Sequence, residues 1–323
     1  MNKIQFAPTI LEHAASLINR TPSECAQCAG LMATAHIEAH RRYRHPFVTV
    51  GMDIYNIEAE ALGCGVRFYA DDSIPGIVTH PYDPESDPGK IKFSVSAGRI
   101  GLILDAAVDI KHAIGDDAIV SVGICGPFSI LIELLGYDSA VDAFIDGDAR
   151  LAGFLDALLI YSKEYCTAII ERNLGVTIFD SWAAPPLSSP DIYRTYSAPY
   201  EHGLISHLER SGLKSRPLVI GGDTSLIVND ILNTGTTLLV SDYNSPLSLF
   251  CGKAKEKEVI LRANIDPRRI WNGDWDYVRS RIEDIYSIYE SYSKIIIGTG
   301  VMPYDTPPGH IERIMEIIDQ QIV

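Results

Sequence analysis

The chain has 323 residues, of which 46% are hydrophobic and 21% charged, as in an ordinary globular protein. Its 27 basic and 42 acidic residues give a net charge of −15, which argues against nucleic acid or an anionic membrane as the main partner. No apolar run approaches the roughly 20 residues that a membrane-spanning helix needs. The N-terminus has no signal-peptide pattern, and the six cysteines are widely spaced, so we expect a soluble protein of the cytoplasm.

The first part of the chain is expected to form helices outside the main domain, an N-terminal helical extension over residues 1–45. Within it, His36 and His40 are four residues apart, so on a helix they share one face and could ligate an ion. The favoured interpretation is a solvated helix face beside the basic run at residues 40–45.

Short β-branched runs alternate with longer helical stretches through the rest of the chain, which indicates repeated strand–helix units and a parallel sheet. Most of the runs are apolar throughout, as strands covered on both faces are. They lie at residues 47–53, 118–124, 175–182, 217–222, 236–242, 258–266 and 294–300. An eighth strand is expected within residues 64–80. This pattern predicts an α/β fold with a single (β/α)8 TIM barrel domain over residues 46–323.

Acidic side chains follow several of these strands, at the ends where a (β/α)8 barrel carries its chemistry. These acids are Asp53, Asp180, Asp223 and Asp242. Such a ring can bind a cation, a metal, pyrrole N–H groups or a polar substrate. The alternative is that each acid caps the helix after its strand, since Asp is a favoured N-cap residue. The glycine turns beside them match no phosphate-binding loop, because neither GxGxxG nor Gly-Lys-Ser/Thr occurs.

Seven motifs follow one another between about residues 45 and 320. They are VTVGMDIYNIEAEALGCGVRFY, GICGPFSIL, DSWAAPPLSSPDIYRTYSAPYEHGLI, GGDTSLIVNDILNTG, SDYNSPLSLF, ANIDPRRIWNGDWDYV and GTGVMPYDTPPGHIERI. In this order they resemble the uroporphyrinogen decarboxylase superfamily, which includes the corrinoid-dependent methyltransferases. The strongest block covers residues 180–204. The resemblance implies the same (β/α)8 barrel that the alternation of strands and helices predicts.

The decarboxylase branch of this superfamily makes demands that the chain does not meet. It carries an arginine-rich N-terminal segment, RQAGRY, that binds the propionates of its substrate, and no such segment occurs here. The positions of its tyrosine and its late histidine are held by Glu133 and Thr299, whereas Asp53 and Ser181 match. A rim of acids would also repel a polycarboxylate. Decarboxylation of a porphyrinogen is therefore the less favoured interpretation.

The methyltransferase branch resembles the chain more closely, in DIYNIEAEALG and DSWAAPPLSSP. Its thiol-activating members hold zinc with a His-x-Cys pair and a later cysteine, and those positions are Val219, Gly221 and Thr299 here. None of these supplies the thiolate or imidazole that zinc prefers. The resemblance therefore implies another methyl donor, such as an aryl methyl ether or a methylated amine, as in the methyltransferase I of an O-demethylase in one-carbon metabolism. It also implies a corrinoid cofactor (methylcobalamin or cob(I)alamin) carried by a small partner protein.

The predicted site combines strand-end residues with the roles that this chemistry requires. A carboxyl kept protonated by burial can protonate a leaving group, and aromatic side chains can stack on an aromatic donor. We predict catalytic roles for Asp53, Asp180 and Asp223, substrate contacts from Tyr55, Asn56, Glu133, Ser181, Trp182, Asp242, Tyr243, Asn264 and Thr299, and weak metal-ligand candidates in Glu58 and His80. A decarboxylase and a non-catalytic barrel that binds a tetrapyrrole or a corrinoid stay open as alternatives, and a homo-oligomer is compatible with the sequence.

Overall fold

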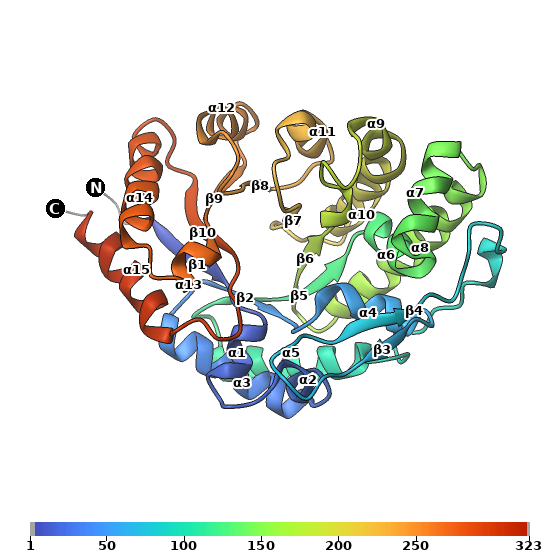
Figure 1. Cartoon of the computed structure of the whole chain (residues 1–323), viewed down its shortest axis with the longest axis horizontal. Helices are drawn as coiled ribbons and strands as arrows, with labels where there is room; N and C mark the ends of the chain where they lie inside the picture. The colour runs from blue at the N-terminus through green and yellow to red at the C-terminus, as the bar shows by residue number, and fades with distance from the viewer. Residues whose placement is uncertain (1–3, 322–323) are drawn as a thin grey trace.

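The computed structural model describes residues 4–321 and shows strands around a central cavity with helices outside them (Figure 1). Eight strands of this described part lie in parallel sheets. They are β1 (Gln5–Thr9), β2 (Phe47–Val50), β5 (Ile119–Cys125), β6 (Gly175–Phe179), β7 (Leu218–Val219), β8 (Leu238–Ser241), β9 (Ile260–Ile265) and β10 (Ile295–Val301).

The first of these strands pairs with the last, since β1 lies parallel to β10 with Ala7 opposite Gly298. Two four-stranded sheets result, in the orders β1-β10-β9-β8 and β2-β5-β6-β7. Next to β7 and β8, the Thr237 N–H donates to the Arg216 carbonyl at 3.2 Å, so the two sheets adjoin there. Within residues 4–321 no strand ladder joins β7 to β8 or β1 to β2. The strand order is nevertheless that of a (β/α)8 barrel, which confirms the predicted fold class.

Strand β9 shows how the sequence sets the two faces of the barrel wall. Alternate residues of a strand point to opposite faces. Leu261, Ala263 and Ile265 are fully buried in the hydrophobic core, on the side that faces the helices. Arg262 and Asn264 line the cavity. A strand that looks apolar in sequence therefore delivers two polar side chains to the interior of the barrel.

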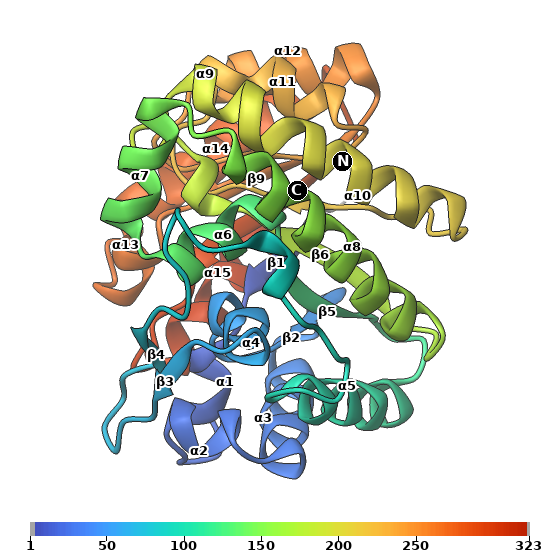
Figure 2. The same ribbon diagram turned by 90° about the vertical axis from the view of Figure 1, so that its right-hand side faces the viewer.

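Helices cover the outside of both sheets. They are α1 (Glu12–Ser16), α2 (Pro22–Ala26), α3 (Ala29–Tyr43), α4 (Ile54–Ala61), α5 (Ile100–Ile114), α6 (Pro127–Leu135), α7 (Tyr137–Asp146), α8 (Arg150–Ile170), α9 (Pro190–Ile192), α10 (Ala198–Arg210), α11 (Val228–Asn233), α12 (Leu247–Lys257), α13 (Pro267–Trp271), α14 (Trp275–Tyr289) and α15 (Pro308–Gln320). Figure 2 shows α1, α2 and α3 at the same end of the molecule as α5, against which α3 packs. No helix within residues 4–321 is both long and apolar enough to span a membrane.

The eighth barrel strand is not where the sequence places it. The segment expected to contain it forms two short antiparallel strands, β3 (Gly65–Arg67) and β4 (Gly76–Thr79), which pair only with each other and lie beside α4 (Figure 2). The eighth strand is β1 instead, inside the segment expected to be helical. The N-terminal segment therefore contributes a strand to the barrel as well as α1–α3. The domain boundary at residue 45 stays a prediction.

Candidate active site

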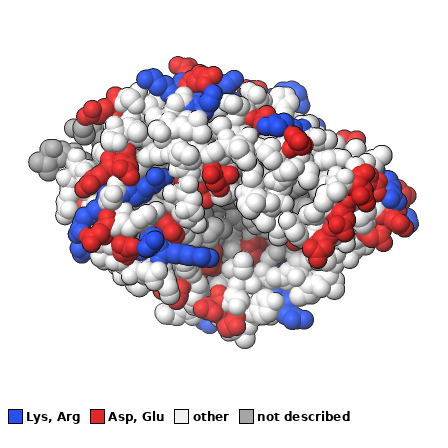
Figure 3. All heavy atoms as spheres, turned by 45° about the horizontal axis from the view of Figure 1, so that its top comes forward, with Lys and Arg blue, Asp and Glu red and all other residues white. Residues whose placement is uncertain are grey.

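A cavity of about 1170 Å³ occupies the interior of the barrel and is lined by residues of all eight barrel strands or the loops that follow them. Figure 3 shows a hollow near the middle of one face, with basic side chains along one edge and acidic side chains inside it. The volume is slightly above the roughly 300–1,000 Å³ that is typical of sites for small organic ligands. The cavity is therefore the candidate active site.

The structure brings most of the predicted site residues to the wall of this cavity. Those that line it are Asp53, Tyr55, Asn56, His80, Glu133, Ser181, Asp242, Tyr243, Asn264 and Thr299. Four predicted residues, Glu58, Asp180, Trp182 and Asp223, are not part of its lining. For these four, a direct contact with a ligand in the cavity has no support in the geometry.

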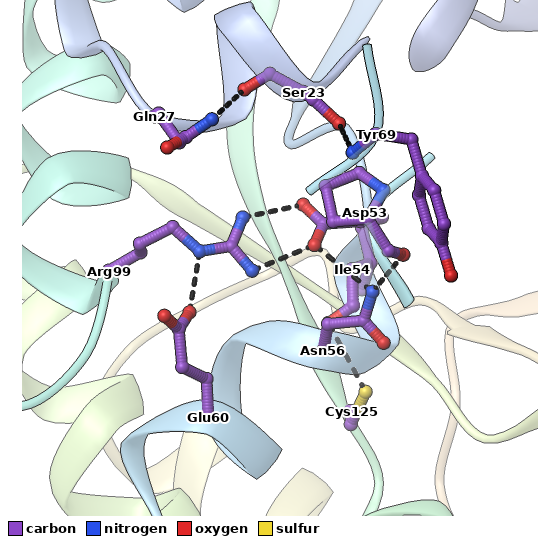
Figure 4. A network of polar contacts seen from close by, with 10 residues as sticks. Ser23, Gln27, Asp53, Ile54, Asn56, Glu60, Tyr69, Arg99 and Cys125 are labelled. Atoms are coloured by element: carbon purple, nitrogen blue, oxygen red, sulfur yellow. Dashed lines mark hydrogen bonds and ion pairs between the residues drawn. The ribbon is translucent and has the colours of Figure 1, made fainter. Parts of the chain in front are cut away.

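Asp53, at the start of α4, is one partner of a buried ion pair (Figure 4). The Arg99 guanidinium donates to both of its carboxylate oxygens, at 2.9 and 2.8 Å, and the Asn56 amide donates at 3.1 Å. Arg99 also donates to the Glu60 carboxylate at 2.5 Å. Burial raises the pKa of Asp53 and the bond from Arg99 lowers it. With both oxygens engaged by Arg99, Asp53 acts as an anchor of the cavity wall.

Glu133, on α6, presents a carboxyl group to the cavity. The Trp182 indole N–H donates to Glu133 Oε1 at 2.7 Å, and no residue within 4–321 donates to Oε2. Burial raises the pKa of this carboxyl, and the hydrogen bond from Trp182 lowers it. The Glu133 main-chain carbonyl bonds the His80 ring at 2.7 Å. Trp182 therefore orients a carboxyl group that has one oxygen free to contact a ligand.

Asp180 lies behind the cavity wall in a fully buried polar cluster. Its Oδ1 accepts from the main-chain N–H of Ser129 at 2.8 Å and from the Ser129 hydroxyl at 2.5 Å. A Cβ at Gly126 would lie 2.0 Å from Asp180 Oδ2, so only glycine leaves room for this carboxyl. Burial raises the pKa of both Asp180 and its neighbour Glu201, which hydrogen-bond to each other. Asp180 therefore positions Ser129, whose hydroxyl accepts from the main-chain N–H of Trp182 at 3.3 Å.

The glycine corner after β7 is held by Ser181 and Asp242. The Gly221 N–H donates to the Ser181 hydroxyl at 3.0 Å, and the Gly222 N–H donates to Asp242 Oδ2 at 2.8 Å. Gly222 has a φ of +83°, which favours glycine. Asp223 is exposed and accepts from the Ser225 N–H at 3.0 Å. Of the two acids, Asp242 shapes the cavity wall and Asp223 stabilises the turn outside it.

The proposed metal ligands do not come together. Among residues 4–321, no three His, Cys, Asp or Glu side chains are arranged to hold an ion. Glu58 is buried, accepts from the Cys125 N–H at 2.8 Å, and has a pKa that burial raises to about 8. The solvated helix face expected for His36 and His40 is wrong, because α3 buries both rings against the body of the protein and burial lowers their pKa values.

Three charged residues of the cavity lining, Glu12, Arg262 and Arg268, are absent from the sequence prediction. Glu12, on α1, lines the cavity, and burial raises its pKa to about 7. Arg262, on β9, points a guanidinium into the barrel. Arg262 could have been predicted from the sequence, because a charged residue inside an apolar strand must face polar groups. Glu12 could not have been predicted, because the sequence analysis does not expect the strand β1 that brings it to the cavity.

A model of the uroporphyrinogen decarboxylase (URO-D) family matches residues 4–321. The chain belongs to the uroporphyrinogen decarboxylase family. The family expected from the order of the motifs is thereby confirmed. Relatives of this family member include a protein of Methanosarcina mazei named methylcobamide:CoM methyltransferase MtbA, which is 24% identical over 273 residues, 83% of this chain and 78% of its own length. They also include a uroporphyrinogen decarboxylase of Burkholderia thailandensis, 23% identical over 276 residues, 80% of this chain and 73% of its own length.

Solved structures place this family member among barrels of the same kind. A structure described as a methyltransferase from Methanosarcina mazei has a TM-score of 0.85 with 20% identity and covers 100% of this chain and 95% of that chain. A putative vitamin-B12 independent methionine synthase from Listeria monocytogenes has a TM-score of 0.59 with 13% identity and covers 100% of both chains. At such identities the likeness shows the fold, and function has to be argued from the site.

Proposed function

We propose that this member of the uroporphyrinogen decarboxylase family transfers a methyl group between a small methylated compound and a corrinoid carried by a partner protein. The similarity to proteins named methylcobamide:CoM methyltransferases, over most of both chains, supports the corrinoid chemistry. The cavity of about 1170 Å³ has room for a small substrate. As the methyl donor we propose an aryl methyl ether or a methylated amine.

The observation that carries the proposal is the oriented carboxyl of Glu133 in the cavity wall. Burial raises its pKa and so favours the protonated form, and no residue within 4–321 donates to its Oε2. When a methyl–oxygen bond breaks, the electron pair stays on the oxygen of the leaving group. A proton given by Glu133 to that oxygen neutralises the leaving group as it departs. Asp180 and Ser129 act indirectly, because their hydrogen bonds hold the loop that carries Trp182.

As the contact surface for the corrinoid and its carrier protein we propose the edge of the cavity, where apolar side chains are exposed. Ile74 and Val301 line the cavity and are 45% and 41% exposed. Exposed apolar side chains around an opening are typical of contact surfaces for ligands or proteins. A corrinoid bound there supplies the cobalt centre that gives or takes the methyl group. This chain then has to orient the small substrate and keep water away from it.

The cavity wall lacks the zinc ligands that activation of a thiol acceptor requires, and this supports a different methyl donor. Val219, Gly221 and Thr299 all line the cavity, and none of them offers sulfur or imidazole to a zinc ion. Tyr55 and Tyr243 line it as well and supply aromatic faces for an aryl group. The Tyr55 hydroxyl is itself fixed, because it accepts from the Ser181 N–H at 3.1 Å.

Methyl transfer can be measured with the purified protein, free cob(I)alamin as the corrinoid, and a panel of methoxylated aromatics and methylamines. The absorbance of the reduced corrinoid reports each transfer. We expect turnover with one donor class and a loss of about 100-fold in Glu133→Gln, the usual size of a general-acid contribution. The same substitution at Glu164, exposed on α8, is the matched control and should keep the wild-type rate.

The same preparations distinguish the alternatives. Release of carbon dioxide from a porphyrinogen without any methyl transfer would replace the proposal with a decarboxylase. Saturable corrinoid binding with neither reaction would leave a non-catalytic barrel. A wild-type transfer rate in Glu133→Gln would remove this carboxyl from the mechanism.

A further inference from the structure

Arg262 crosses the cavity wall from β9 to β1. Its Nη2 donates to the Ala7 carbonyl at 2.9 Å and to the Thr9 hydroxyl at 2.7 Å, both on β1. Strand β10 lies between these two strands in the sheet, so the side chain spans three neighbouring strands. Its Nε donates to Asn264 Oδ1 at 3.1 Å, two residues along the same face of β9. These bonds hold the guanidinium in one orientation inside the barrel.

Gly298 makes this arrangement possible. It lies on β10 opposite Ala7 on one side and Asn264 on the other. A Cβ built on Gly298 would be 2.4 Å from Arg262 Nε, 2.4 Å from Asn264 Oδ1 and 2.8 Å from Arg262 Cγ. Any other residue at this position would displace the two side chains. The side chains of Arg262 and Asn264 therefore occupy the space that a side chain at position 298 would need.

Within the described residues, the charge of Arg262 has no acidic partner. None of the carboxylates within residues 4–321 forms an ion pair with it, whereas its four hydrogen bonds go to neutral oxygens. Burial lowers the pKa of Arg262 to about 10, which still leaves it charged at neutral pH. A buried charge without a counter-ion is unfavourable unless something supplies the opposite charge.

The groups that remain free at this wall are donors. No residue within 4–321 accepts from Arg262 Nη1 or from the Asn264 side-chain amide nitrogen. Because Arg262 Nε engages Asn264 Oδ1, the Asn264 amide is fixed with its N–H groups away from that contact. Both residues line the cavity. A ligand that meets them needs acceptor oxygens and a negative charge, which is the description of a carboxylate.

We propose that Arg262 and Asn264 bind the carboxylate of the small substrate, so that the compound that gives or takes the methyl group is a methylated carboxylic acid. That the ligand is methylated rests on the proposed function. The carboxylate site itself is inferred from Arg262, Asn264 and Gly298 alone. A carboxylate oxygen accepts from Arg262 Nη1 and the other accepts from the Asn264 amide, with the methylated end directed towards the cavity mouth. Arg262 is a binding residue in this scheme and takes no part in proton transfer.

Isothermal titration calorimetry without any corrinoid tests the site separately from methyl transfer. The probes are 4-methoxybenzoate, propionate and acetate, each compared with its neutral amide. Wild-type protein should bind at least one carboxylate about tenfold or more tightly than its amide, which is the order of a charge-assisted hydrogen bond. Arg262→Met should lose that difference, and Arg262→Lys should keep part of it because the charge remains.

A matched control is Arg279→Met, which removes an exposed arginine that bonds only Asp276 within the described residues and should bind like wild type. The circular dichroism spectrum of each variant checks that it folds. The proposal is overturned if wild type prefers no carboxylate over its amide, if Arg262→Met binds carboxylates as wild type does, or if sulfate and phosphate bind as tightly as carboxylates. Carboxylate binding without methyl transfer would leave this site standing and refute the proposed function, and methyl transfer from neutral donors only would do the reverse.

Discussion

Two arginines with little exposure to solvent, Arg99 and Arg262, differ in what balances their charge. Arg99 contacts the carboxylates of Asp53 and Glu60 and packs over the Phe68 ring, outside the cavity lining (Figure 4). Arg262 lines the cavity and contacts only neutral oxygens within residues 4–321. The first arrangement is complete in the protein alone, whereas the second lacks an anion. The difference separates a cation that holds the wall from a cation that is available to a ligand.

The largest effect is expected from Arg99→Met. The substitution leaves the Asp53 carboxylate buried without its cation, and loss of one partner from a buried ion pair costs about 3–5 kcal/mol. Urea denaturation followed by circular dichroism measures the free energy of unfolding. Arg279→Met, on the exposed face of α14, is the matched control and should change it by less than about 0.5 kcal/mol. A loss below about 1 kcal/mol in Arg99→Met would mean that the ion pair does not hold the wall.

Gly298→Ala addresses the other arginine and should have an intermediate effect. The new Cβ would meet Arg262 Nε and Asn264 Oδ1 at 2.4 Å, so the side chains must shift, and overpacking of this kind costs about 1–3 kcal/mol. We expect a fall in the free energy of unfolding together with loss of carboxylate binding. Gly252→Ala on α12 is the control, because no atom lies within 4 Å of its Cβ and alanine favours the helix. Retained carboxylate binding in a folded Gly298→Ala protein would contradict the role of the glycine.

Glu58 extends the comparison to a buried carboxyl group that becomes neutral by binding a proton. Its Oε2 is buried without a partner in the described residues, and burial raises its pKa from 4.5 to about 8. The folded state therefore keeps a proton that the unfolded state has released between about pH 5 and 8. Across this window the free energy of unfolding decreases as pH rises, by up to about 1.4 kcal/mol per pH unit from this one group.

Glu58→Gln removes that titration and keeps an acceptor for the Cys125 N–H. We expect the variant to lose less stability than wild type between pH 6 and 8, measured by urea denaturation at each pH. Asp180, Glu201 and Glu12 contribute in the same direction and are unchanged in the variant. The exposed substitution Glu164→Gln should keep the wild-type slope. Parallel pH profiles for Glu58→Gln and wild type would show that Glu58 is ionised in the folded protein.

The sequence predicts the barrel well where strands are apolar and poorly where they are short and mixed. The sequence predicts β5 and β10 because both contain apolar, β-branched runs, and in the structure most residues of both strands are buried. β1 was missed because QFAPT is short and contains a proline that signals a turn or an edge. The sequence locates an acid at the end of a strand to within a residue or two, but it does not show whether the side chain points into the cavity. Asp53 and Asp180 follow equivalent strands, yet only Asp53 lines the cavity.

The smallest effect is expected at Asp223, where the sequence and the structure support different interpretations. Its place after β7 suggests catalysis, but its carboxyl is exposed, lies outside the cavity lining and accepts from the Ser225 N–H. Asparagine can accept the same hydrogen bond, so Asp223→Asn should change the free energy of unfolding by a few tenths of a kcal/mol. The initial rate of methyl transfer to cob(I)alamin should stay within about twofold of wild type, since surface substitutions away from a site rarely matter. A loss of tenfold or more would mean that the loop after Gly222 closes over the substrate, and Asp223 would then join Glu133 as a catalytic group.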